Sequence, residues 1–132
     1  MLINFSVRKK TFYGILAGLV VYAMIGSIGL FLFIKCWPAY AIASKDKSYS
    51  FEMLLSRLSI GTLASVLAGI VATKMAKDSG KTAWVVGALV CCVAAYVHFF
   101  SVWADYPLWY HFAYLLPILP VTGLSHYFIK KK

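Results

Sequence analysis

Residues 12–34 read FYGILAGLVVYAMIGSIGLFLFI and contain no charged side chain. A helix rises about 1.5 Å per residue, so a run of this length crosses a bilayer hydrocarbon core of about 30 Å. Arg8, Lys9 and Lys10 stand directly before the run. The apolar part of a cleaved signal peptide is shorter, about 7–15 residues. The run therefore predicts a transmembrane helix, in preference to a signal peptide cleaved after residues 41–43.

Three further apolar segments follow, at about residues 51–73, 82–103 and 108–128. The connections between them are short and leave no room for a soluble domain. The pattern predicts an all-α integral membrane protein, a four-transmembrane-helix up-down bundle that forms a single membrane domain over residues 1–132. Pro117 and Pro120 fall inside the fourth segment and predict a kink there.

The charges of the chain stand at the ends of the apolar segments. Of the 132 residues, 62% are apolar or aromatic and 13% are charged, with a net charge of +9. On one predicted side lie Arg8, Lys9, Lys10, Lys74, Lys77, Lys81, Lys130, Lys131 and Lys132, and on the other lie Lys35, Lys45 and Lys47. By the positive-inside rule both termini are cytoplasmic, as in a multi-pass protein of a bacterial inner membrane. Anionic lipid headgroups are the expected partners of the lysines, and nucleic acid is not.

Small residues recur at helical spacing on three segments, which is typical of faces where membrane helices pack together. The predicted packing positions are Gly14 and Gly18 on the first segment, Gly61, Ala64 and Ala68 on the second, and Gly87 and Cys91 on the third. Arg57 and His98 fall on the same faces, so we expect both to point into the bundle. The Gly14/Gly18 pair serves packing within the chain or, alternatively, a homo-oligomer or a membrane protein partner.

Four polar residues fall at one predicted depth. Counted at about 1.5 Å per residue, Ser27, Arg57, His98 and His111 lie roughly 24–26 Å from the cytoplasmic ends of their helices. Glu52 and Asp105 lie above this layer, and Tyr110 lies beside it. An ionisable residue inside a membrane span marks a candidate functional site. These residues are therefore the predicted ligand or ion site. The alternative is a structural clasp in which Arg57 pairs with Glu52 or Asp105.

The chemistry expected of this layer stays open. No spacing indicates a catalytic group, a metal site or a cofactor. The first segment lacks the acidic residue of small multidrug exporters, and only Cys36 lies outside the membrane, unlike the cysteine pairs of quinone-linked disulfide oxidoreductases. The sequence favours a non-enzymatic accessory or interacting membrane subunit. The alternatives are a small transporter or channel for an ion, a proton or a small anion, and a membrane-embedded enzyme or lipid- or quinone-binding protein.

Overall fold

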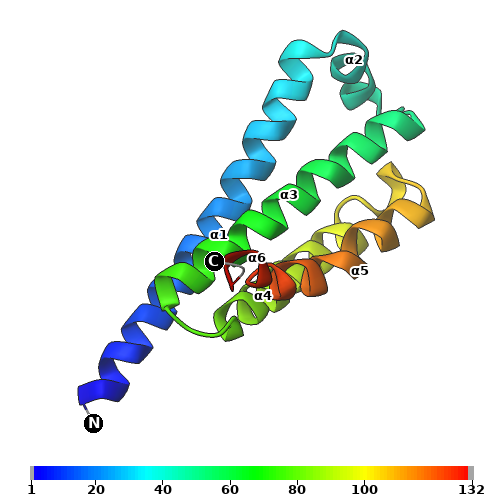
Figure 1. The fold of residues 1–132 in the computed structure, drawn as a ribbon. Helices are drawn as coiled ribbons and strands as arrows, with labels where there is room; N and C mark the ends of the chain where they lie inside the picture. Colours follow the sequence, from blue (N-terminus) through cyan, green and yellow to red (C-terminus); the bar gives the residue numbers. More distant parts are fainter. Residues whose placement is uncertain (1, 131–132) are drawn as a thin grey trace.

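The computed structural model describes residues 2–130, and the side chains of residues 5–129, as helices joined by short connections (Figure 1). The elements are α1 (Leu2–Cys36), α2 (Pro38–Asp46), α3 (Phe51–Ala76), α4 (Lys81–Phe100), the 3-10 helix η1 (Trp103–Asp105), α5 (Leu108–Leu124) and α6 (Tyr127–Lys130). No strand occurs among these residues. Four helices are long and apolar enough to cross a membrane: α1, α3, α4 and α5 continued by α6. The predicted all-α fold with four candidate membrane spans is confirmed.

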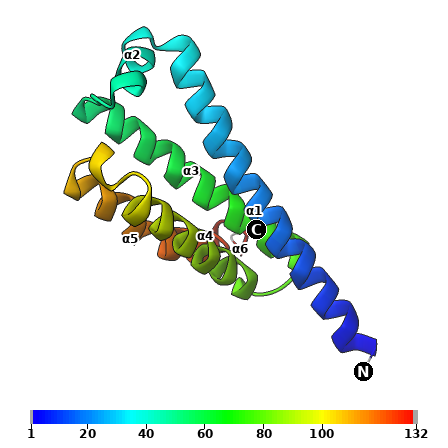
Figure 2. The same ribbon diagram turned by 180° about the vertical axis from the view of Figure 1, so that it is seen from behind.

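Helix α1 begins ten residues earlier than the predicted segment. It includes Arg8, Lys9 and Lys10, because the chain before residue 12 contains no proline or glycine that would end a helix. With 35 residues it is about 50 Å long, and its N-terminal part projects past the other helices (Figures 1 and 2). Met1, Lys131 and Lys132 lie outside the described residues, so the predicted side of those two lysines is not addressed by the structure.

The connection after α1 holds a helix that the sequence interpretation missed. Trp37 is extended and Pro38 occupies the first helical position of α2, where its missing N–H costs nothing. Lys47, in the left-handed region with φ 60°, ends α2. Of the other predicted bounds, the third segment ends at Phe100 and not at residue 103, and the fourth divides into α5 and α6. Helix α5 includes both Pro117 and Pro120.

Helices α1 and α3 pack through small residues. A Cβ atom added to Gly14 would lie 2.7 Å from the Ala72 carbonyl oxygen, and one added to Gly18 would lie 3.1 Å from the Ala68 carbonyl oxygen. Ala68 and Ala72 are fully buried. The glycines therefore allow close approach of the two backbones, and α3 covers this face of α1.

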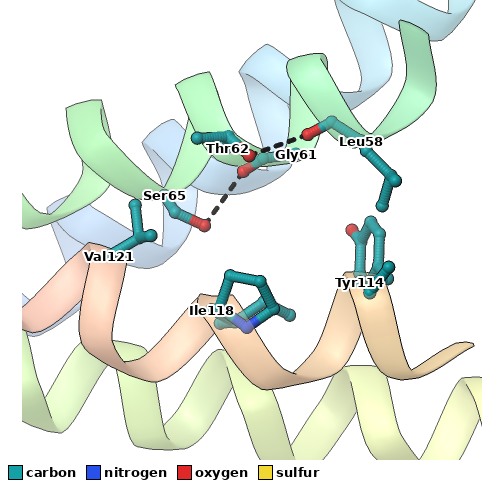
Figure 3. Close-up of a pocket in the computed structure, with 9 residues that line it drawn as sticks. Leu58, Gly61, Thr62, Ser65, Tyr114, Ile118 and Val121 are labelled. Atoms are coloured by element: carbon teal, nitrogen blue, oxygen red, sulfur yellow. Dashed lines mark hydrogen bonds between the residues drawn. The ribbon is translucent and has the colours of Figure 1, made fainter. Parts of the chain in front are cut away.

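Helices α3 and α5 meet along an apolar contact that leaves a cavity of about 20 Å³ (Figure 3). Tyr114 of α5 lies against Gly61 of α3. The Ser65 hydroxyl donates a hydrogen bond to the Gly61 carbonyl at 2.9 Å, and the Thr62 hydroxyl donates to the Leu58 carbonyl at 2.9 Å. Because these hydroxyls are hydrogen-bonded within their own helix, they need no hydrogen-bond partner from α5.

Ser50 caps the N-terminus of α3. Its hydroxyl oxygen accepts a hydrogen bond from the Met53 backbone N–H at 3.3 Å. Ser50→Ala is expected to lower the free energy of unfolding by about 1 kcal/mol, because that N–H loses its partner. Thermal unfolding in a mild detergent measures the change. Ser56→Ala is the control, since the exposed Ser56 hydroxyl bonds only to the Glu52 carbonyl of its own helix. Equal effects of the two substitutions would contradict the capping role.

Candidate functional site

Arg57 of α3 is surrounded by four tyrosines from different parts of the chain. Its Nε donates to the Tyr110 hydroxyl at 3.1 Å, and its Nη1 donates to the Tyr40 hydroxyl at 2.6 Å. The guanidinium carbon lies 5.5 Å from the ring centroid of Tyr49 and 5.1 Å from that of Tyr106. We call these four tyrosines the tyrosine cage. It holds the cation by two hydrogen bonds and two cation–π contacts.

The cage contains no carboxylate. Glu52 is exposed and Asp105 is half-buried, and within the described part of the chain neither forms an ion pair with Arg57. Glu52 precedes Arg57 by five positions, whereas side chains on one helix face are three or four positions apart. The clasp alternative, in which Arg57 pairs with Glu52 or Asp105, is therefore not the arrangement found.

Two hydroxyls of the cage, those of Tyr40 and Tyr106, are neutral. Burial raises the pKa of the Tyr40 hydroxyl above its usual value of 10.0, although the neighbouring Arg57 guanidinium opposes this shift. Burial likewise raises the pKa of Tyr106, again against the opposing effect of Arg57. Both hydroxyls thus keep their protons at neutral pH. The charge of Arg57 is met by neutral oxygens and ring faces, and not by an anion of the chain.

His98 of α4 and His111 of α5 form a hydrogen-bonded pair. Their Nδ1 atoms are 2.8 Å apart, and Nε2 of His111 lies 3.0 Å from the Trp103 carbonyl oxygen. A carbonyl only accepts, so His111 carries its proton on Nε2. In the neutral pair His111 Nδ1 then accepts from His98 Nδ1–H. The order of protons leaves Nε2 of His98 as a free acceptor, with no hydrogen-bond partner among the described residues.

A cavity of about 370 Å³ lies between α1 and α4, and we call it the lateral cavity. The two helices are close at Gly18 and Val86, and they diverge toward the end of the molecule that carries α2 (Figure 2). Ala23, Val93 and Val97 line the cavity and are themselves exposed. In a membrane the cavity would therefore open sideways to the lipid.

One wall of the lateral cavity is polar. Arg57, His98 and the tyrosines Tyr22, Tyr106, Tyr110 and Tyr114 form it. The hydroxyls of Tyr22 and Tyr114 are hydrogen-bonded at 2.7 Å, which joins α1 to α5. The Tyr114 ring stacks on His98 with centroids 4.7 Å apart. The other lining residues are aliphatic, so the lateral cavity has both a polar and an apolar part.

The structure brings some of the predicted site residues together and leaves others apart. Arg57, His98 and Tyr110 line the lateral cavity. His111, only 1% exposed, lies behind His98 and does not line it. Ser27 is exposed on α1 and lies outside the cavity lining, as do Glu52 and Asp105.

Five tyrosines of the site were not predicted as site residues: Tyr22, Tyr40, Tyr49, Tyr106 and Tyr114. Tyr22 carried a usable signal, because it falls four positions after Gly18 on the glycine face of the first segment. The others come from connections and from helices whose relative placement the sequence does not reveal.

Within residues 5–129 no group of three histidine, cysteine, aspartate or glutamate side chains is placed to hold a metal ion. Comparison of the chain with protein-family models, curated proteins and solved structures found no significant match. The function must therefore be argued from the geometry of the tyrosine cage, the histidine pair and the lateral cavity.

Proposed function

We propose that the chain is a non-enzymatic multi-pass membrane protein that binds an amphipathic molecule drawn from the bilayer. The polar head of this ligand lies at Arg57 and His98, and its apolar part lies between α1 and α4. The observation that carries the proposal is Arg57: a cation without a carboxylate partner in the described chain, on the wall of a cavity that opens sideways.

Arg57 has hydrogen-bonding capacity to spare. A guanidinium group has five N–H donors, and two of them are bonded to tyrosine hydroxyls, which leaves three. A charged residue within a membrane span is costly to place there, and such residues commonly mark binding sites. The free donors suit a ligand whose head carries oxygen acceptors.

The shape of the lateral cavity suits one small or single-chain molecule. Its volume of about 370 Å³ lies near the lower end of the range of about 300–1,000 Å³ for small-molecule pockets. Apolar side chains such as Leu19, Val90 and Ala94 line the part away from Arg57. Burial of an alkyl chain against them contributes roughly 0.8 kcal/mol per CH₂ group.

The other half of the molecule supports binding rather than conduction. Below the lateral cavity Ala68, Ala72, Ala83 and Val86 have exposures of 0%. These residues fill the space between the helices on the side of the α3–α4 turn. With both termini cytoplasmic by the positive-inside rule, the site would face the outer leaflet.

A tryptophan at the rim tests the proposal. Ala23→Trp is expected to fill the mouth of the lateral cavity and to lower ligand occupancy about tenfold, equivalent to about 1.4 kcal/mol. The protein in detergent is incubated with palmitic acid, hexadecanol and hexadecylamine together, and native mass spectrometry counts the retained molecules. Met24→Trp is the control, because Met24 is 54% exposed and lies outside the cavity lining. Equal retention by the two variants would place binding elsewhere.

A further inference from the structure

We infer that the ligand of the lateral cavity is a weak oxygen acid on a single apolar chain, a carboxylic acid or a phosphate monoester, held with one proton between Arg57 and His98. This inference rests on the proposed function and specifies its ligand. It adds that an acid that is ionised in water takes up one proton on binding.

The first step is the direction of the hydrogen bonds around the histidine pair. The Trp103 carbonyl fixes the proton of His111 on Nε2. His111 Nδ1 is then an acceptor, so in the 2.8 Å contact between the two Nδ1 atoms His98 is the donor and carries its proton on Nδ1. Nε2 of His98 then offers only a lone pair. His98 lines the lateral cavity and is 7% exposed. An acceptor on the wall of the lateral cavity with no partner in the described part of the chain calls for a ligand that donates a hydrogen bond.

The second step is the neighbouring cation. Arg57 and His98 share Tyr106 and Tyr110 as neighbours: Arg57 contacts both, and the His98 ring lies 6.4 Å and 6.0 Å from their centroids. Arg57 can only donate, so the same head must also accept. A protonated acid group meets both demands with two oxygens, one that accepts from Arg57 and one that carries O–H toward His98. A primary ammonium would be repelled by the guanidinium.

The third step is the proton balance. The titratable groups around His98 come from several elements: Arg57 from α3, Tyr106 from the connection after η1, and Tyr22 of α1 at the same cavity. From α5 come His111, Tyr110 and Tyr114. None of these is an anion. A carboxylate that enters with one proton from solvent becomes a bound acid whose proton is shared between its oxygen and His98 Nε2, and no other bond is made or broken.

Calorimetric titration of the full chain in detergent tests the inference. Palmitic acid and hexadecyl phosphate are the acid probes, and hexadecanol and hexadecylamine are the matched neutral and cationic probes. Titrations in two buffers of different ionisation enthalpy count the protons bound.

Carboxyl groups ionise with a pKa of about 4, so palmitic acid should take up about one proton at pH 6–8 and lose affinity about tenfold per pH unit. A phosphate monoester keeps one proton below its second pKa of about 6, so its proton uptake should appear only above that pH. The two pH profiles distinguish the carboxylate and phosphate sources.

Two variants test the contribution of the His98 side chain. His98→Phe keeps an aromatic ring against Tyr114 and removes Nε2, so acid binding is expected to fall about tenfold and proton uptake to vanish. Tyr96→Phe, at an exposed position on the same helix, should leave both unchanged. Equal affinity for all four probes would overturn the inference while the proposed function stands. So would the binding of palmitic acid at pH 6–8, or of hexadecyl phosphate above pH 6, without proton uptake. If none of the probes binds the unmodified protein, the proposed function itself is wrong.

Discussion

Arg57→Gln is expected to weaken the binding of palmitic acid by roughly 10- to 100-fold. A hydrogen bond that involves a charged group contributes about 1.5–3 kcal/mol, and the glutamine amide keeps donors but loses the charge. The affinity of Arg57→Lys for palmitic acid should lie between those of the unmodified protein and Arg57→Gln, since a lysine keeps the charge but not the planar array of donors. Calorimetric titration at pH 6, where the proposed complex is favoured, measures all three proteins.

Two controls separate binding from folding in this series. Arg8→Gln removes the same charge from an exposed position on the projecting part of α1 and should leave binding unchanged. If Arg57→Gln binds palmitic acid as tightly as Arg8→Gln does, the guanidinium does not hold the head. Thermal unfolding of each variant in the same detergent shows whether a loss of binding reflects a loss of structure.

The four helices that are long and apolar enough to cross a membrane could be predicted because their signal is local. A run such as residues 12–34 is long, apolar and uncharged, and no soluble element competes for that pattern. The ends of the helices were harder to predict. A segment defined by hydropathy ends at the first charged residue, whereas a helix ends where its backbone hydrogen bonding stops. Helix α1 therefore extends N-terminally beyond the apolar run and includes Arg8 and Lys10. Helix α2 has only nine residues, and its start depends on the turn at Trp37 and Pro38.

The candidate site could be predicted in part for the same reason. Arg57 and His98 share helix faces with small residues, and that spacing placed both toward neighbouring helices. Their partners come from elsewhere in the chain: Tyr40 of α2 accepts a hydrogen bond from Arg57, and His98 pairs with His111 of α5, which is itself bonded to the Trp103 carbonyl of η1. A backbone carbonyl has no sequence signal at all. The lateral cavity depends on the angle between α1 and α4, which many side-chain contacts determine together.

Predictions about partners stay predictions. The Gly14/Gly18 face of α1 is covered by α3, so self-association would have to use another face. The exposed side chains of the four long helices are mostly apolar, as lipid contact or a membrane protein partner would both require. The oligomeric state in mild detergent distinguishes these two uses of the surface.

Opposite effects on stability are expected from one change, glycine to alanine, at two positions. At Gly69 of α3 a Cβ atom would collide with the Thr122 carbonyl oxygen and the Ser125 hydroxyl of the chain around the end of α5. Ser125 has an exposure of 0% and its hydroxyl donates to Thr122 at 2.6 Å, so neither group can move aside freely. Overpacking of this kind costs about 1–3 kcal/mol, and Gly69→Ala should lower the free energy of unfolding by that amount.

At Gly26 of α1 the added Cβ meets no atom within 4 Å. Alanine is favoured over glycine inside a helix by about 0.5–1 kcal/mol, because glycine loses more backbone freedom on folding. Gly26→Ala should therefore raise the unfolding temperature while Gly69→Ala lowers it, in the same detergent and at the same protein concentration. A decrease of similar size for both would mean that glycine is required for flexibility of the helices and not for their approach. An unchanged Gly69→Ala protein would mean that α5 does not pack against α3 as closely as Ser125 and Thr122 indicate.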